Sequence, residues 1–283
     1  MIGRVLTFAG DMPELPEVET VVRGLREPLI GRTVVSMWFD WDRTVKTPDP
    51  VQFAARIAGQ TFQSITRRAK YIVCKLDDDL LVVHLKMTGR LYVVPDEMVT
   101  NADRWMHFRL QLDNGHQLRF SDARKFGFVA LTEHLDAVTP LLGPEPLSDD
   151  FSPAVLHERL GKHKKAIKAL LLDQAFLAGV GNIYADESLF LAKIHPQRPS
   201  NSLNEDEIAL LYTTIRQVLD AGIEREGASI NWYRKPDGTT GEAQLYFNVY
   251  DRAELPCVVC GGTISKIRVA QRGTHFCPVC QKL

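Results

Sequence analysis

The chain has 283 residues, enough for two domains and a small appendage, and its 45% hydrophobic and 24% charged residues are ordinary for a soluble globular protein. Its apolar runs are too short to span a bilayer, which excludes an integral membrane protein. A net charge of −1 excludes a general attraction to nucleic acid, so any such binding must use local basic patches. The first segment, MIGRVLTFAGD, has no convincing signal-peptide cleavage site, and we therefore predict a cytoplasmic protein.

The segment MPELPEVET, residues 12–20, predicts the start of a helix. Apolar residues follow with the spacing of one helical face: Val18, Val21, Val22 and Leu25. Pro16 suits the first helical position, and acids in the first turn favour the same start. Pro13 and Glu14 are therefore expected immediately before a helix over 16–26. A surface segment leading into a packed helix explains these residues equally well on their own.

Residues 33 to 131 predict an antiparallel β-sandwich or flattened barrel with the 16–26 helix packed on it. Short runs rich in β-branched and aromatic residues are separated by turns, and Asn114-Gly115 is a strong hairpin signal. The predicted strands cover residues 33–39, 70–76, 80–85, 90–94, 107–112, 116–120 and 126–131.

A Pro- and Asp-rich boundary at 142–151 separates these strands from a helical region. Helical periodicity covers residues 154–160, 165–174, 182–193 and 205–223. The glycine-rich turn AGVGN places Asn182 at the start of one of these helices. Residues 226–243 predict a long polar loop, of the kind that is usually a functional lid or disordered.

The cysteines predict one structural zinc site near the end of the chain. Cys74 stands alone in a strand-like run and is expected to be a buried small hydrophobe. The other four form two C-x2-C pairs, Cys257 with Cys260 and Cys277 with Cys280, separated by 16 residues. Disulfides are disfavoured in the cytosol, and four thiolates leave no open position for catalysis.

Basic and apolar residues gather on several predicted turns. The intervening GTISKIRVAQRGTHF predicts a zinc-braced hairpin that presents Arg272 as a phosphate clamp. Basic groups beside apolar wedges suit a protein that enters the DNA stack and replaces an extruded base. Solvated helix faces and ordinary hairpin charges explain each group separately. The residues are Arg67, Arg68, Lys70, Met87, Arg124, Lys125, Phe126, Lys162, Lys164, Lys165 and Lys168.

The order of these motifs resembles the formamidopyrimidine-DNA glycosylases over residues 12–282. The motifs are MPELPEVET, RRAKY, HLKMTGRL, DARKFG, LGPEPLSDDF, AGVGNIYADESLF and the terminal C-x2-C-x16-C-x2-C. PELPEVET also differs from the PEGP start of the related endonuclease VIII group, which prefers oxidised pyrimidines. The resemblance implies an α+β fold with an N-terminal β-sandwich and a C-terminal helical domain. A helix–two-turn–helix unit and a zinc-finger hairpin belong to the second part.

The resemblance also implies that Pro13 is the chain's first residue in the active enzyme and its nucleophile. Its secondary amine would attack the sugar C1′, expel the damaged base and form a Schiff base. A proline nitrogen in a peptide bond to Met12 is an amide without useful nucleophilicity. We therefore expect Met12 to be the true start, with residues 1–11 a misassigned start or a tag. By the same resemblance Glu14 is the proton donor and Glu17 supports the pocket behind it.

Further roles follow from the same resemblance. Lys70 corresponds to the lysine of β-elimination, and Arg272 to the hairpin arginine that binds phosphates and is associated with δ-elimination. The remaining predicted DNA-binding residues are Met87, Arg124 and Phe126, which fill the void left by the flipped base, and His107, His163, Lys168 and Asn182. The chain departs from the family pattern at Lys86, where glycine is usual, at Trp105, where a histidine is expected, and at His163, where lysine is common.

The sequence thus predicts a base-excision-repair glycosylase and abasic-site lyase that acts on 8-oxoguanine and formamidopyrimidines in damaged double-stranded DNA. We expect one Zn²⁺, a monomer and no membrane association. The predicted parts are an extension at 1–12, a catalytic domain at 13–146, a helical DNA-binding domain at 147–243 and a zinc-finger hairpin at 244–283. Two alternatives stay open: a glycosylase for oxidised pyrimidines, and a non-catalytic damage-binding protein if the extension is retained.

Overall fold

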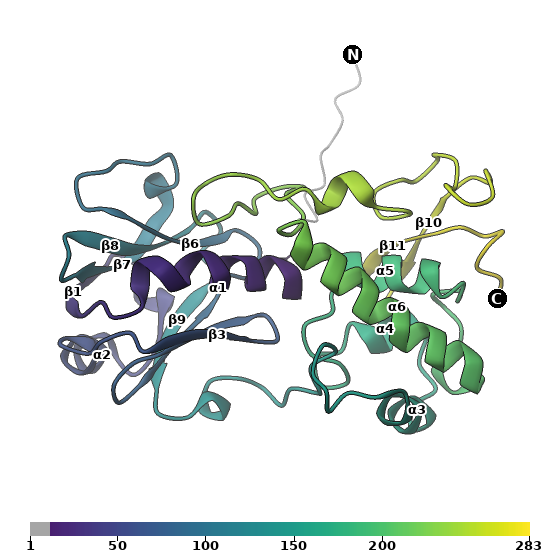
Figure 1. The fold of residues 1–283 in the computed structure, drawn as a ribbon, viewed down its shortest axis with the longest axis horizontal. Coiled ribbons are helices and arrows are strands. Elements are labelled where there is room, and N and C mark those ends of the chain that lie inside the picture. The colour runs from purple at the N-terminus through teal and green to yellow at the C-terminus, as the bar shows by residue number, and fades with distance from the viewer. Residues whose placement is uncertain (1–11) are drawn as a thin grey trace, which may run out of the picture.

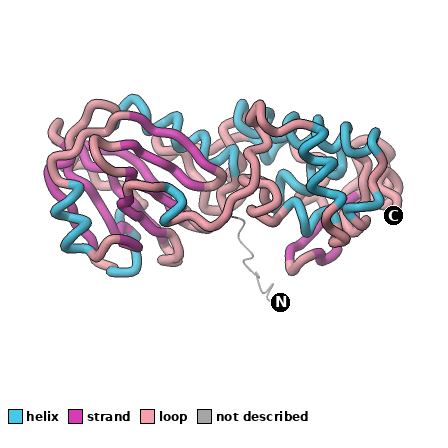
Figure 2. The backbone as a smooth tube through the Cα atoms, turned by 90° about the horizontal axis from the view of Figure 1, so that it is seen from below, coloured by secondary structure: helices cyan, strands magenta, loops and turns pink. Residues whose placement is uncertain are grey.

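The structure, a computed structural model, describes residues 12–283 and has the α+β fold that the sequence predicts. The expectation about residues 1–11 lies outside the described residues. Two lobes follow one another along the long axis, one built mainly of strands and the other of helices (Figures 1 and 2). Helix α1 (Leu15–Leu29) runs along the first lobe, and its amino-terminal end lies against the second lobe (Figure 1).

The strand-rich lobe contains a four-stranded sheet of order β1-β7-β8-β6 and a five-stranded sheet of order β2-β9-β5-β4-β3. The strands are β1 (Val34–Phe39), β2 (Val45–Thr47), β3 (Ser64–Arg68), β4 (Tyr71–Lys75), β5 (Leu80–His84), β6 (Gly89–Pro95), β7 (Met106–Leu112), β8 (His116–Asp122) and β9 (Phe128–Thr132). All seven predicted strands are confirmed. The structure adds β2, β3 and helix α2 (Pro50–Ile57), whose short or charged sequences lack a clear alternation.

One apolar core fills the space between these sheets and α1. Val18 and Leu25 of α1 are fully buried in one cluster with Phe108 of β7 and Val83 of β5. The α1 face that the spacing predicted is thus the face that packs on the strands. Cys74 is buried in the same core, as its apolar neighbours predicted.

The second lobe is built from four helices around a separate core. They are α3 (Pro153–Gly161), α4 (Ile167–Leu171), α5 (Asn182–Leu191) and α6 (Glu205–Glu224). Helix α4 is shorter than the predicted 165–174 because the chain turns at Leu172 and Asp173, where backbone bonds from Leu172 to Lys168 and from Asp173 to Leu170 close it. Leu15, the first residue of α1, belongs to this second core. Helix α1 therefore belongs to both lobes.

Short 3-10 turns and a hairpin complete the fold. The turns are η1 (Asp42–Thr44), η2 (Asp103–Trp105), η3 (Leu135–Ala137), η4 (Ser200–Ser202) and η5 (Ala243–Tyr246). Strands β10 (Ser265–Val269) and β11 (Arg272–Phe276) form the predicted hairpin. Ala270 and Gln271 between them have φ of 48° and 61°, the left-handed pair that a tight two-residue hairpin turn requires.

The 226–243 loop contains no α-helix or strand, as its polar sequence predicted. It is nevertheless packed on the rest of the protein, because Tyr233 is only 7% exposed and contacts the core of the strand-rich lobe. Among the described residues, no helix has the length and apolar content to cross a membrane.

Candidate active site

Pro13 lies where the two lobes meet, directly before α1. The amide of Leu15 donates to the carbonyl oxygen of Gly179 in the second lobe (3.1 Å), which fixes the start of the helix. Glu14, the residue between, has extended backbone, and its amide donates to the Glu17 carboxylate one turn later (2.9 Å). This return bond from the third helical position is half of a capping box and holds Pro13 in a defined place.

The Glu14 carboxylate binds the amino end of α5. It accepts hydrogen bonds from the amides of Ile183 (2.9 Å) and Tyr184 (3.4 Å), and the side chain is 2% exposed. The positive end of a helix stabilises such a buried negative group. Gly181 makes room for it, because a Cβ there would lie 2.4 Å from the carboxyl carbon of Glu14.

Glu17 is a second buried carboxylate directly behind Pro13. One of its oxygens accepts from the Tyr184 hydroxyl (2.8 Å) and the Ala228 amide (2.7 Å), and the other from the Glu14 amide. Burial raises the pKa of the Glu17 carboxyl, and the bonds from Ala228 and Tyr184 oppose part of that rise. Burial and the adjacent Glu17 charge raise the pKa of the Tyr184 phenol well above its usual value, so it stays a donor. Glu17 therefore joins α1, α5 and the first residues of the 226–243 loop.

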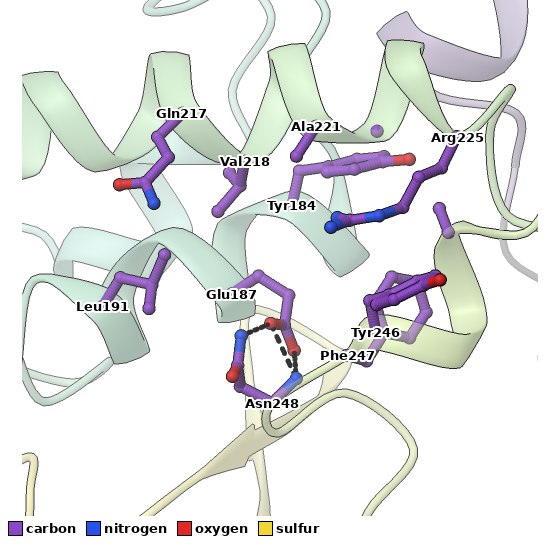
Figure 3. A pocket seen from close by; sticks show the side chains of 12 residues that line it. Tyr184, Glu187, Leu191, Gln217, Val218, Ala221, Arg225, Tyr246, Phe247 and Asn248 are labelled. Atoms are coloured by element: carbon purple, nitrogen blue, oxygen red, sulfur yellow. Dashed lines mark hydrogen bonds between the residues drawn. The ribbon is translucent and has the colours of Figure 1, made fainter. Parts of the chain in front are cut away.

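Tyr184 also borders a cavity of about 330 Å³ between α5, α6 and the 243–248 segment (Figure 3). Glu187 at its edge accepts hydrogen bonds from the Asn248 amide (2.9 Å) and side chain (2.8 Å). The amides of Val249 and Tyr250 also donate to it, each at 2.9 Å. Glu187 thereby ties the segment that leads to the zinc-finger hairpin to α5, the same helix that binds Glu14.

Lys70 occupies the turn between β3 and β4 and is 6% exposed. The neighbouring Arg67 and Arg68 pair with Glu145 in the connection between the lobes (2.7 and 2.9 Å). These two arginines therefore hold the lobes together, in contrast to the DNA-entering role that their turn position indicated. The paired residues lie 77 and 78 positions apart, and the sequence alone gives no signal of the contact.

A cluster of lysines surrounds His84 beside this turn. The lysines are Lys86, Lys70 and Lys46. Burial of the His84 ring, and then the positive charges of these lysines, lower the pKa of His84 to about 3. Lys86 has a φ of 51°, the left-handed conformation that explains why glycine is usual here in the family pattern. A neutral histidine among three cationic side chains makes this edge of the lobe suited to an anion.

Met87, Arg124 and Phe126 lie together, as predicted, although they come from two separate connections. An Arg124 Nη1 donates to the Met87 sulfur (3.2 Å), and its guanidinium carbon lies 4.9 Å from the Phe126 ring centre. Asp122, which the sequence did not single out, organises them. Its buried carboxylate accepts from the amides of Arg124 (3.1 Å) and Phe126 (2.8 Å) and from the Thr88 hydroxyl. Arg124 and Phe126 are exposed at the end of this support.

Lys168 is placed differently from the predicted phosphate contact. It has no exposed surface, and its Nζ pairs with Asp186 of α5 (2.6 Å) and donates to the Thr274 hydroxyl of β11 (2.8 Å). Asp186 also accepts from the His275 amide (2.8 Å). A side chain buried in this way does not contact a phosphate directly. The prediction of a direct phosphate contact by Lys168 is therefore wrong. The lysine instead fixes the strand that begins with Arg272.

The other predicted DNA-binding residues are dispersed. Asn182 is the half-buried first residue of α5, and its side-chain nitrogen lies 3.5 Å from the Tyr250 hydroxyl. His163 packs edge-on against Phe176, with ring centres 5.9 Å apart. His107 is 6% exposed, and its Nδ1 lies 2.7 Å from an Asp40 oxygen.

Arg272 is exposed at the tip of the β10–β11 hairpin, and the four cysteines lie at its base. The cysteine sulfurs all fall within 4.8 Å of one another, and two pairs are 3.5 and 3.9 Å apart. A tetrahedron with Zn–S bonds of ~2.3 Å has S–S edges of about 3.8 Å. These residues, Cys257, Cys260, Cys277 and Cys280, fit one structural zinc ion.

Three family models match consecutive parts of the chain. They are the formamidopyrimidine-DNA glycosylase N-terminal domain at residues 12–129, the H2TH domain of the same enzymes at 142–234, and a zinc finger found in FPG and IleRS at 254–283. The zinc-finger match agrees with the geometry of the four sulfurs.

Known proteins resemble the chain over nearly its whole length. The formamidopyrimidine-DNA glycosylase of Chloroflexus aurantiacus is 49% identical over 274 residues, which cover 95% of this chain and 98% of the relative. That of Enterococcus faecalis is 42% identical over 278 residues, with 96% and 98% covered. A solved Lactococcus lactis FPG mutant bound to Fapy-dG DNA superposes with a TM-score of 0.88 at 40% identity, covering 96% of this chain and 100% of that one.

A solved complex of MutM with DNA containing carbocyclic 8-oxo-G gives a TM-score of 0.87 at 39% identity, with 96% of this chain and 100% of that chain covered. The agreement extends over both lobes and the zinc finger. The chain therefore belongs to the formamidopyrimidine-DNA glycosylase family, the base-excision glycosylases that remove oxidised purines from DNA.

Proposed function

We propose that Pro13 is the nucleophile of this glycosylase and that the same site cleaves the resulting abasic strand. The proline nitrogen attacks C1′ of the damaged nucleotide, the bond from C1′ to the base breaks, and the base leaves with that electron pair and a proton. The proline nitrogen then loses its proton and forms a double bond to C1′, while the C1′–O4′ bond breaks and O4′ takes up a proton. The resulting iminium makes the C2′ proton acidic, so the 3′ phosphate and then the 5′ phosphate leave by β- and δ-elimination. The observation that supports this most is Pro13 held beside two buried carboxylates at the junction of the lobes.

This chemistry needs a free secondary amine at Pro13. An amide bond to Met12 would delocalise the nitrogen lone pair. We therefore infer that Met12 and the residues before it are absent from the active enzyme, and the family model begins its match at Met12. The positive end of α1 beside the amine disfavours its protonation, which favours the nucleophilic form at neutral pH.

Two carboxylates have separate functions, proton transfer by Glu14 and positioning by Glu17. Glu14, aligned by the Ile183 and Tyr184 amides, takes up the proton that the attacking proline nitrogen loses and delivers it to the leaving base or the opening sugar. Glu17 holds Glu14 and the first residues of the 226–243 loop in place behind the reacting carbon. Lys70 is suited to the elimination steps, since it lies in a turn on a cationic edge that would also face a phosphate.

The DNA is held on both lobes in this proposal. Met87, Arg124 and Phe126 fill the space that the extruded nucleotide leaves, while Arg272 binds phosphates beside the lesion. Asn182 offers a donor at the amino end of α5, and the resemblance to the family assigns His107 and His163 to DNA binding as well. Lys168 contributes through the position of β11.

In this proposal the chain has three functional parts: a catalytic part at 13–146, a helical DNA-binding part at 147–243 and a zinc-finger hairpin at 244–283. We also propose that the protein works as a monomer in the cytoplasm. Damaged duplex DNA is its partner, as it is for the relatives whose complexes have been solved.

The chemistry can be tested with two forms of the protein, one beginning at Pro13 and one retaining residues 1–12. The first should cut duplexes containing 8-oxoguanine opposite cytosine and form a covalent adduct with that DNA in borohydride. It should act poorly on thymine glycol. The longer form should bind abasic DNA without trapping, because its proline nitrogen is an amide. Equal trapping by both forms contradicts the role of Pro13, and a preference for thymine glycol contradicts the purine assignment.

The alignment of Glu14 can be tested with Gly181→Ala. The added methyl displaces the carboxylate, since a Cβ there approaches it to 2.4 Å. Loss of a positioned proton donor should lower the single-turnover rate of 8-oxoguanine excision by about 100-fold or more. Gly161→Ala is the control, because a Cβ at that position meets nothing within 4 Å. An excision rate equal to that of wild type in correctly folded Gly181→Ala protein would contradict the role assigned to Glu14.

The contact of Arg272 can be tested by measuring DNA affinity over a range of salt concentrations. Arg272→Ala should weaken binding to damaged and undamaged duplexes alike and reduce the slope of log K against log salt by about 0.9. Arg23→Ala provides a control on α1, where the arginine is exposed and pairs with Glu19 of its own helix. An unchanged slope for Arg272→Ala would show that this arginine does not neutralise a phosphate.

Removal of zinc tests the support of the hairpin. Without the ion, the two cysteine turns lose their common anchor, so Arg272 is no longer held in place. Metal-free protein should therefore lose both duplex binding and strand cleavage, and zinc should restore them. Metal analysis and a binding titration measure the effect. Full DNA affinity in protein proven to be metal-free would contradict a structural role.

A further inference from the structure

Two tryptophans join the 226–243 loop to the strand-rich lobe. The ring centres of Trp105 in η2 and Trp232 in the loop are 5.1 Å apart, with an interplanar angle of 78°. This edge-to-face arrangement is a favourable aromatic contact. The guanidinium carbon of Arg104 lies over the Trp105 ring, 3.6 Å from the ring centre. We call Trp105 and Trp232 together the aromatic clasp.

The Trp105 side of the clasp is rigid. Asp103, in the same 3-10 turn, accepts from the hydroxyl of Tyr92 (2.6 Å), the Thr100 amide (2.6 Å) and the Arg119 guanidinium (3.0 Å). Tyr92 and Arg119 are buried at 2% and 4% exposure in β6 and β8. The turn that carries Trp105 is thus fixed to the four-stranded sheet and provides a firm attachment for the loop.

The Trp232 side of the clasp reaches the catalytic centre. Asn231, Trp232 and Tyr233 line a cavity whose other walls include Pro13 and Glu17. That cavity measures about 20 Å³, which is room for one water molecule and far too little for a purine. Met12 forms another wall, and its removal opens the cavity on the Pro13 side. The wall made by the loop remains, and its position then sets the shape of the space that receives the base.

The loop is attached elsewhere as well, and Tyr233, next to Trp232, is itself buried in the core of the strand-rich lobe. Its first residues are held by the bond from the Ala228 amide to Glu17, and Pro236 packs against Gly24 of α1, where a Cβ would lie 3.0 Å from the proline ring. Residues 229–234 cross between these contacts, and the clasp connects that stretch to the strand-rich lobe.

We infer that the aromatic clasp is a positioning element for base recognition, which holds the Asn231–Tyr233 wall of the loop in place over the site of the extruded base. This inference rests on the proposed function and adds Trp105 to it, at the position where the family pattern has a histidine. Neither tryptophan needs to touch the reacting atoms. Cleavage of an abasic site, which has no base to position, does not require the clasp.

The test compares excision of 8-oxoguanine with cleavage of a preformed abasic site in the same duplex, using protein that begins at Pro13. Trp105→Ala should lower kcat/KM for 8-oxoguanine excision by about three- to tenfold, the range expected for an aromatic pair. Abasic-site cleavage should stay within about twofold of wild type. Trp105→Phe, which retains an aromatic edge for Trp232, should restore most of the excision.

A double-mutant cycle and a matched control complete the design. The variant with both Trp105→Ala and Trp232→Ala should excise 8-oxoguanine no more slowly than Trp232→Ala alone, since either change breaks the same contact. Trp38→Ala is the control. Trp38 is as exposed as Trp232, at 39% against 40%, and like Trp105 it lies under an arginine, with the Arg109 guanidinium carbon 5.2 Å from its ring centre. It should leave both activities unchanged.

Several results would overturn the clasp. These are an equal loss of both activities in Trp105→Ala, no loss of excision, or losses that add in the double variant. Failure of the proposed function is distinguishable from these, because wild-type protein that begins at Pro13 would then cleave neither substrate. If wild-type protein cleaves both substrates and Trp105→Ala does so equally well, the inference about the clasp is wrong and the proposed function stands.

Discussion

The structure depends on the hydrogen bonds that the Glu14 carboxylate makes with the amino end of α5. Glu14 and its partners are 169 and 170 residues apart in the chain, so this contact joins the beginning of the strand-rich lobe to the helical lobe. It also determines where Pro13 lies, because Pro13 directly precedes Glu14. The same bonds that connect the two lobes therefore align the two residues that we propose as the nucleophile and its proton donor.

Helix α1 strengthens this connection by belonging to both cores. Leu15 packs among the helices, while Val18 and Leu25 pack among the strands. Arg67 and Arg68 add ion pairs to Glu145 in the covalent connection between the lobes. A movement of one lobe relative to the other would displace the amino end of α1, so a fixed arrangement of the lobes preserves the positions of Pro13 and Glu14.

Buried charge is the cost of this arrangement, and the hydrogen bonds offset it. An unpaired carboxylate at this depth would be strongly unfavourable. Glu14, Glu17 and Glu187 are each surrounded by backbone amides or a hydroxyl, so each is stabilised by groups from a distant part of the chain. Because Glu17 also accepts from Ala228, the loop over the base site is coupled to the carboxylates beneath it. In the proposed function, recognition of a base and alignment of the catalytic groups thus share Glu17.

Much of this could be predicted from sequence, and the limits have physical causes. Short runs rich in β-branched and aromatic residues predicted seven strands, and cysteine spacing predicted the zinc site, because both signals are local. The short β2 and the charged β3 lack such a signal. Burial of Lys168 was not predictable, since it depends on Asp186 and Thr274 in other elements. The sequence marked Trp105 as a departure from the family pattern but gave no sign of its contact with Trp232.

The claim that these contacts serve one nucleophile is tested most directly by locating the covalent bond. DNA containing an abasic site would be trapped with borohydride on the native protein, digested, and the modified peptide sequenced by mass spectrometry. The account predicts that the sugar remnant lies on the nitrogen of Pro13, in a peptide that begins with that residue. A remnant on a lysine side chain, such as Lys70, with Pro13 still in a peptide bond to Met12, would contradict it.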